Sequence, residues 1–228
     1  MPARMREGFL GRLGMTHSYT NFVMVPKILV ENISEHPEET SLIVAENEVL
    51  YYLVYGFAEA VKHVNVKLNG RGAEAYILGI LVGQEGRCGL RTLQDHTAPD
   101  TKSDLLVRSV LGGNAALDYQ GKIVIERDAQ RSNAYQRNEN ILMSNRAHVD
   151  TKPELEILAN DVRCTHGATV GKLEDEPIFY LQSRGLPEKE AERLILEGFI
   201  NDVLAKIPDE QIKSNVHERL MNELVRSV

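Results

Sequence analysis

Residues 161–171 read Asp-Val-Arg-Cys-Thr-His-Gly-Ala-Thr-Val-Gly, with the segments 151–157 (TKPELEI) before them and 178–185 (IFYLQSRG) after them. If residues 161–171 form a strand, Cys164 and His166 are two positions apart and point to the same face. A thiol beside an imidazole suits an activated nucleophile, or a thiolate and nitrogen pair that binds zinc, iron or an iron–sulfur cluster. The spacing alone also permits a buried structural cysteine beside a surface histidine.

Upstream of this stretch, the pattern is typical of short strands rather than helices. Residues 61–68 alternate between the apolar Val64, Val66 and Leu68 and the polar residues between them, and Asn69–Gly70 predicts a hairpin after this strand. No helical pattern of about ten residues interrupts the series, which argues against a doubly wound α/β fold. The predicted strands, separated by glycine and asparagine, are residues 41–45, 48–54, 61–68, 74–82, 105–111 and 122–126.

Two all-β architectures fit this series of strands, a β-sandwich and a parallel β-helix. The strand-bearing segments recur at roughly 12 to 20 residues, without a strict repeat. A coil of a β-helix buries its inner face only against neighbouring coils, so that fold needs several turns and protected ends. Composition and spacing leave both architectures open.

Helical periodicity begins at about residue 175. Pro177 lies near the start of a first predicted helix and Gly185 lies where it ends, while Pro187 and Pro208 precede two more. We therefore expect a C-terminal helical domain over residues 175–228. Its apolar positions step by three and four residues: Ala191, Leu194, Ile195, Gly198 and Phe199 in the second helix, and Ile212, Val216, Leu220 and Leu224 in the third.

Residues 1–40 are expected to form an N-terminal extension that is partly disordered. Within it, residues 21–32 carry an apolar run that Pro26 interrupts, which predicts an edge strand or an extended segment. Disorder is expected in residues 1–15.

Composition limits the class of protein. The 228 residues are 43% hydrophobic and 26% charged, which is typical of a globular chain. Lys and Arg number 26 against 33 Asp and Glu, and the net charge of −7 argues against a nucleic-acid partner held by phosphate contacts. The longest apolar run, residues 75–84, is too short to span a bilayer, and glycines at 8, 11 and 14 break up any signal peptide. We expect a cytoplasmic protein without membrane insertion.

Several kinds of site find no support in the sequence. The two cysteines form no CxxC pair, so a disulfide framework is not expected. The chain has no GxxxxGK[ST], GxGxxG, GxSxG or HExxH motif, and we expect no nucleotide bound by this chain. His63, His96 and His148 are predicted to be solvated or hydrogen-bonded surface residues, and Asn138 and Asn140 to be turn residues near strand ends.

The three segments quoted first resemble the C-terminal half of the SufB/SufD family, the scaffold proteins of the Suf machinery for iron–sulfur cluster assembly. The resemblance is strong from about residue 90 to 205, and the His-Gly-Ala-Thr form at 166–169 is similar to the SufD type. It implies a mainly β fold, with a right-handed parallel β-helix core over residues 41–174 followed by a small C-terminal α-helical domain. It also implies a short variant that lacks most of the family's N-terminal region.

The resemblance implies a scaffold subunit rather than an enzyme. In this family two subunits pair through their β-helices, and the C-terminal helices of each dock a SufC-type ATPase. The position matching His166 is important in the family and Cys164 is its neighbour, so both are expected to bind a transient iron–sulfur cluster as cofactor and metal ligands at the subunit interface. The residues expected to dock the ATPase are Phe179, Tyr180, Leu181 and Arg184.

A cluster commonly takes four thiolate ligands, whereas this chain has two cysteines far apart. We therefore expect ligands from a second chain, either a SufB-type subunit or a second copy that would place two Cys164 and two His166 together. Cys88 is expected to be a buried structural thiol. Two alternatives stay open: an ATPase-binding module without a metal role, and a β-helix enzyme that uses Cys164 and His166.

Overall fold

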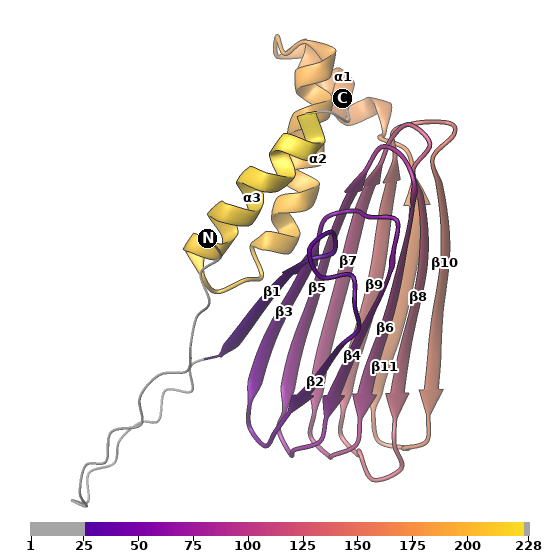
Figure 1. Cartoon of the computed structure of the whole chain (residues 1–228), viewed down its shortest axis with the longest axis vertical. Coiled ribbons are helices and arrows are strands. Elements are labelled where there is room, and N and C mark those ends of the chain that lie inside the picture. Colours follow the sequence, from indigo (N-terminus) through magenta and orange to yellow (C-terminus); the bar gives the residue numbers. More distant parts are fainter. Residues whose placement is uncertain (1–25, 226–228) are drawn as a thin grey trace, which may run out of the picture.

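The computed structural model of the chain describes residues 26–225, which fold into parallel strands followed by helices (Figure 1). The strands are β1 (Lys27–Asn32), β2 (Thr40–Val44), β3 (Val49–Tyr55), β4 (Val61–Leu68), β5 (Glu74–Gly83), β6 (Arg87–His96), β7 (Lys102–Leu111), β8 (Ala116–Ile125), β9 (Asn133–Leu142), β10 (His148–Ile157) and β11 (Arg163–Gly171). One sheet, sheet A, has the order β1-β3-β5-β7-β9-β11, and the other, sheet B, has the order β10-β8-β6-β4-β2.

Consecutive strands alternate between the two sheets and pair in parallel with strands one coil away, so the chain winds into a β-solenoid. This confirms the parallel β-helix and excludes the sandwich. In sheet A, Lys27 lies beside Leu50 in the first coil, and Asn133 lies beside Arg163 in the last, so the spacing in sequence between paired residues grows. Because the coil lengthens along the chain, the sequence shows no strict repeat.

The hairpin predicted at Asn69–Gly70 is wrong, because β4 and β5 belong to different sheets. This turn is a corner of the solenoid, and a side chain on Gly70 would collide with the backbone of Ala45 and Glu46 in the preceding coil. Glycine is required here for the close stacking of coils rather than for a hairpin turn.

The inner faces of both sheets form the main core. Val64, Val66 and Leu68 are fully buried, while Asn65 and Lys67 point outward, which confirms the predicted alternation. The core includes large fully buried side chains such as Tyr52 and Tyr119, and aliphatic residues from successive coils stack beside them. Burial of this apolar surface is the dominant stabilising contribution to a fold of this kind.

Several inward positions in the later coils are polar, and three sequence predictions are wrong for that reason. His96 was expected at the surface but is fully buried at the end of β6. Asn138 and Asn140 were expected in turns but are buried within β9. Their side chains are hydrogen-bonded inside the solenoid, and a hydrophobic pattern cannot reveal such positions. His63 and His148 are exposed, as predicted.

The helices are α1 (Asp175–Ser183), α2 (Glu188–Leu204) and α3 (Glu210–Val225). Helices α2 and α3 pack on the outer face of sheet A, where Leu196, Ile200 and Leu220 meet Leu53 and Leu78 in a second apolar cluster (Figure 1). None of the helices within residues 26–225 is long and apolar enough to cross a membrane.

Polar contacts also hold α2 on the sheet. The Arg108 guanidinium of β7 donates to the backbone carbonyl of Phe199, pairs with Asp202 at 2.9 Å and lies over the Phe199 ring. The C-terminal end of the helix is fixed by Lys206, whose ammonium lies 2.9 Å from Asp104.

The N-terminal part of the solenoid contains the expected edge strand. Within residues 21–32 the described strand is β1, which lies at the edge of sheet A and pairs with β3. The disorder expected in residues 1–15 concerns positions outside the described part of the chain.

Candidate functional site

The C-terminal end of the solenoid is open, because β10 and β11 form the last coil and no described strand lies beyond them (Figure 1). Apolar side chains of this coil are consequently exposed, among them Leu155, Ile157 and Val170, the last of which is 44% exposed. An apolar face of this kind marks a surface that another polypeptide can cover.

Cys164 and His166 both lie on β11, and the alternation of the strand directs them to the same side, toward the inside of the solenoid. In register, Cys164 lies beside Ala134 and His166 beside Gln136 of β9. Cys164 packs against the apolar cluster that contains Ile123 and is half-buried, whereas His166 is exposed at the open end.

Burial raises the pKa of the Cys164 thiol above its usual value of 9.0. In the single chain this sulfur is therefore protonated at neutral pH, and it must lose its proton to bind a metal. His166 lies on the same face of β11, two residues further along the strand.

Metal ligands are too few in one chain. Among residues 26–225, no three His, Cys, Asp or Glu side chains gather closely enough to hold a metal ion. Cys164 and His166 together offer one sulfur and one nitrogen, which fits half of a four-ligand set. A cluster assembled at this place would be cargo rather than a resident cofactor.

The two free edges of the last coil differ in what they offer a second chain. Backbone N–H groups in a parallel strand point alternately to its two neighbours. On β11 the N–H of Arg163 bonds to the carbonyl of Ser132, directly before β9, so the N–H groups of Cys164, His166 and Ala168 point to the free edge.

On β10 the N–H of His148 bonds toward β8, which places Pro153 at a free-edge position where a donor is missing. Because proline has no backbone N–H to donate, it disfavours the pairing of another strand with the free edge of β10. The strand β11 contains no proline, so all the N–H groups on its free edge can donate. Sequence reasoning did not use this proline, although proline inside a strand is a recognisable edge signal.

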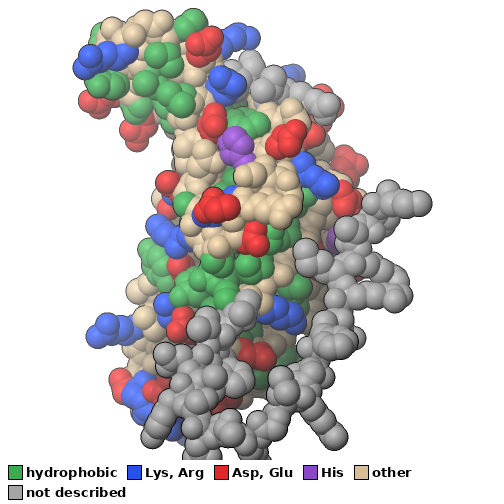
Figure 2. Space-filling view, turned by 90° about the vertical axis from the view of Figure 1, so that its left-hand side faces the viewer, with side chains coloured by type: hydrophobic (Ala, Val, Ile, Leu, Met, Phe, Trp, Pro, Cys, Tyr) green, Lys and Arg blue, Asp and Glu red, His purple; other side chains and the backbone are tan. Residues whose placement is uncertain are grey.

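The residues expected to dock an ATPase lie on and directly after α1. Phe179 is 72% and Tyr180 is 56% exposed, and Arg184 lies with its guanidinium 5.3 Å from the centre of the Tyr180 ring. Leu181 is half-buried. The helical lobe that contains α1 stands out from the end of the solenoid and carries hydrophobic side chains on its surface (Figures 1 and 2).

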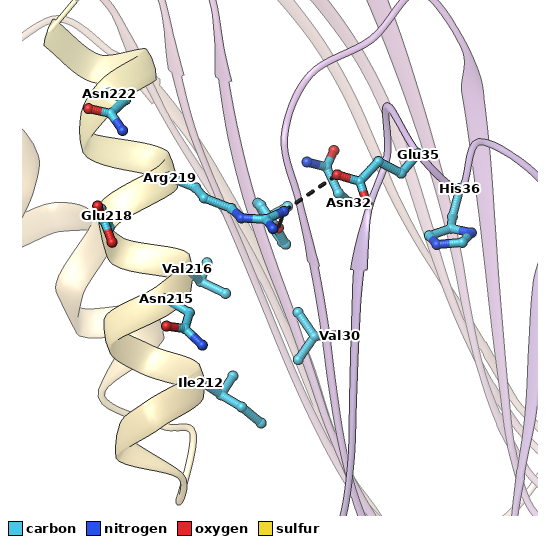
Figure 3. A pocket seen from close by; sticks show the side chains of 11 residues that line it. Val30, Asn32, Glu35, His36, Ile212, Asn215, Val216, Glu218, Arg219 and Asn222 are labelled. Atoms are coloured by element: carbon cyan, nitrogen blue, oxygen red, sulfur yellow. Dashed lines mark hydrogen bonds and ion pairs between the residues drawn. The ribbon is translucent and has the colours of Figure 1, made fainter. Parts of the chain in front are cut away.

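A groove lies elsewhere, between α3 and β1, with a volume of about 770 Å³ (Figure 3). Arg219 reaches across it from α3 to Tyr55, at 2.9 Å, and to Glu35, at 3.4 Å. Its lining includes no cysteine, and its single histidine, His36, is an exposed residue of a loop. This groove therefore lacks the chemistry that β11 offers.

Sequence comparison identifies the family to which the chain belongs. Residues 44–199 match the family model described as "SUF system FeS cluster assembly, SufBD core domain". The matched residues include β3 to β11, α1 and most of α2.

The chain belongs to the SufBD family. It is 32% identical over 202 residues to the iron–sulfur cluster assembly protein SufD of Escherichia coli, covering 87% of this chain and 48% of that protein. It is 31% identical over 169 residues to an iron–sulfur cluster assembly SufBD family protein of Mycobacterium leprae, covering 70% and 43%. A chloroplastic protein of Arabidopsis thaliana, ABCI7, is 36% identical over 108 residues, which cover 47% and 22%. The chain thus spans about half the length, or less, of these three relatives.

Proposed function

We propose that this SufBD protein is a scaffold subunit for iron–sulfur cluster assembly, acting through the open end of its solenoid. The observation that carries the proposal is the unblunted free edge of β11, which presents the backbone of Cys164 and His166 beside their own side chains. A second chain that pairs there brings its own ligands to the same place. Since residues 26–225 of one chain supply only a partial ligand set, the proposed assembly relies on that pairing.

The second chain is either another copy of this protein or a SufB-type subunit. Two copies would bring together two Cys164 and two His166, a mixed sulfur and nitrogen set that soft metal ions accept. A SufB-type chain would supply ligands of its own. Separately, the exposed α1 surface with Phe179 and Tyr180 would dock a SufC-type ATPase, because exposed aromatic side chains are common anchors of protein interfaces.

Loss of the ligands should abolish cluster formation without loss of the fold. The complex purified anaerobically from its native host is assayed for iron and acid-labile sulfide and its partners are identified by mass spectrometry. We expect iron and sulfide to fall to background in Cys164→Ser and in His166→Ala, because each substitution removes one of the proposed ligands. Both side chains lie at the open end, so folding should survive.

Cys88→Ala is the matched control, because Cys88 is fully buried in the solenoid core. It removes the same thiol from a place where no ligand role is proposed, and iron should be retained. If iron and sulfide persist in both Cys164→Ser and His166→Ala while the partners still co-purify, the metal role is refuted and an ATPase-binding module remains. An eluate of wild-type complex without an ATPase would contradict the docking proposal.

Pairing through β11 is tested by Ala168→Pro, which removes a free-edge N–H but none of the bonds to β9. We expect the affinity for the partner chain to fall at least about tenfold, because one donor is lost and the ring obstructs a facing strand. Sedimentation of the purified complex measures this. Thr169→Pro is the control: its N–H points to β9, so it should instead destabilise the monomer. Unchanged pairing in Ala168→Pro would exclude β11 as the interface edge.

A further inference from the structure

A polar network lies inside the solenoid, one coil away from its open end. Gln94 and His96 enter it from β6, and Ser103 and Gln136 enter it from β7 and β9. All four are buried, with at most 2% of their surface exposed. Polar side chains in such a place are expected to have hydrogen-bond partners for each buried atom.

The hydrogen-bond donors of this network can be accounted for one by one. The Thr101 hydroxyl has the Ala98 carbonyl at 3.1 Å and the Ser132 hydroxyl at 2.7 Å as partners for its proton, so its oxygen accepts from His96 Nδ1 at 2.7 Å. His96 Nε2 then carries no proton and accepts from the Ser103 hydroxyl at 2.7 Å. The Ser103 oxygen in turn accepts from Gln94 Nε2 at 2.6 Å. The imidazole is thus neutral, with its proton on Nδ1.

Two buried oxygens in this network have no donor. Gln94 Nε2 also lies 3.3 Å from the Tyr135 carbonyl, and Gln136 Nε2 donates to the Gly121 carbonyl at 3.2 Å. Because a carbonyl can only accept, these contacts determine which end of each amide is nitrogen. The remaining atoms, Gln94 Oε1 and Gln136 Oε1, are buried without a partner. An unpaired buried acceptor costs about 1–3 kcal/mol.

The two amides meet in the same part of the lumen. Gln94 reaches from sheet B to the carbonyl of Tyr135, and Gln136 is the next residue of that strand. Gln136 reaches in the opposite direction, to Gly121 of sheet B. A side chain at position 121 would collide with the Tyr119 hydroxyl and the Gln136 amide, so the glycine provides the space that this crossing needs.

We propose that a buried water molecule bridges Gln94 Oε1 and Gln136 Oε1. The bound species must be a donor, since both free atoms are acceptors, and this excludes anions. It must also be uncharged, because the network contains no carboxylate to offset a buried cation. Water supplies two protons, one for each oxygen, and buried waters of this kind are regular parts of protein structures. The proposal is independent of the scaffold function.

The position of this water connects the interior with the candidate site. Gln136 lies beside His166 in the register of β9 and β11, and both side chains point inward. The bridged network therefore extends from the buried His96 to the strand that forms the mouth of the solenoid. It provides a hydrated, uncharged lining directly behind His166.

A crystal structure of the wild-type chain at a resolution that shows ordered waters tests the proposal. We expect density within hydrogen-bonding distance of both oxygens, and in solution a long-lived water giving a cross-peak with the Gln94 side-chain amide protons. In Gln136→Met this cross-peak should be lost. Asn140 provides the internal control, because its amide bonds to Asn138 and to the Thr169 carbonyl and should show no water cross-peak.

Three results would overturn the inference. The first is a crystal structure without density between Gln94 Oε1 and Gln136 Oε1. The second is a structure in which both oxygens accept hydrogen bonds from protein donors. The third is density at this place for a species other than water. If Gln136→Met does not fold, the wild-type crystal structure and the wild-type cross-peak still decide the question.

Discussion

Replacement of Lys62 with methionine is expected to lower the free energy of unfolding by about 3 kcal/mol, because removing one partner of a buried ion pair leaves the other groups uncompensated. The Lys62 side chain is completely buried, and its ammonium lies 2.8 Å from Glu31. It also donates to the backbone carbonyls of His36, at 3.0 Å, and Glu38, at 2.7 Å. These contacts fix the loop between β1 and β2 over the N-terminal end of the solenoid.

The electrostatics of Glu31 support this estimate. Burial raises the pKa of the Glu31 carboxyl, but hydrogen bonds from Lys62, Tyr52 and Thr40 outweigh burial and hold the pKa below its usual value of 4.5. The carboxyl is still 25% exposed, so water can compensate part of the loss, and the lower end of the usual range of about 3–5 kcal/mol applies.

Lys67→Met is the matched control for this prediction, measured in the same urea unfolding experiment. Lys67 lies on the same strand, also beside a carboxylate, Asp95, but it is 49% exposed and the pair is 3.7 Å apart. A surface pair of this kind contributes at most about 1 kcal/mol. Equal effects of the two substitutions would show that burial of Lys62 does not determine its contribution.

The second large effect is a loss of stability in mild acid caused by His96. Burial lowers the pKa of His96 from its ordinary 6.5 to about 4. The unfolded chain therefore binds this proton at a higher pH than the folded chain does, and the free energy of unfolding falls as the pH falls from about 6.5 to about 4. A pKa difference of one unit corresponds to about 1.4 kcal/mol, so the shift of His96 contributes about 3 kcal/mol to the free energy of unfolding at neutral pH.

His96→Gln removes this titration, and the experiment compares its unfolding free energy with that of the wild type at several pH values. The unfolding free energy of the wild type minus that of the variant should be largest above pH 6.5 and should fall by about 3 kcal/mol toward pH 4. The carboxylates titrate alike in both proteins, so their contribution cancels in this difference. A constant difference for His96→Gln would mean that the folded chain does not hold this imidazole neutral.

The sequence by itself determined the short strands and the helical tail, and its family resemblance determined the solenoid. Alternation in residues 61–68 assigned Val64, Val66 and Leu68 to one face, and glycine and asparagine marked the corners between strands. Such patterns are local, because a strand has a period of two and a helix a period of 3.6, and both can be read from neighbouring residues. The motif at 161–171, through its family resemblance, selected the β-helix over the sandwich.

Only the tertiary structure decided which polar residues point inward and what they contact there. The same alternation that buries Val64 also buries Lys62, yet its carboxylate and carbonyl partners come from residues 31–38, a coil earlier. His96 contacts Thr101 and Ser103 because the chain turns the corner between β6 and β7, and Cys164 and His166 lie at a free edge only because no described strand follows β11. Burial of a polar group depends on partners from other strands and corners, and these come together only when the chain folds around the lumen.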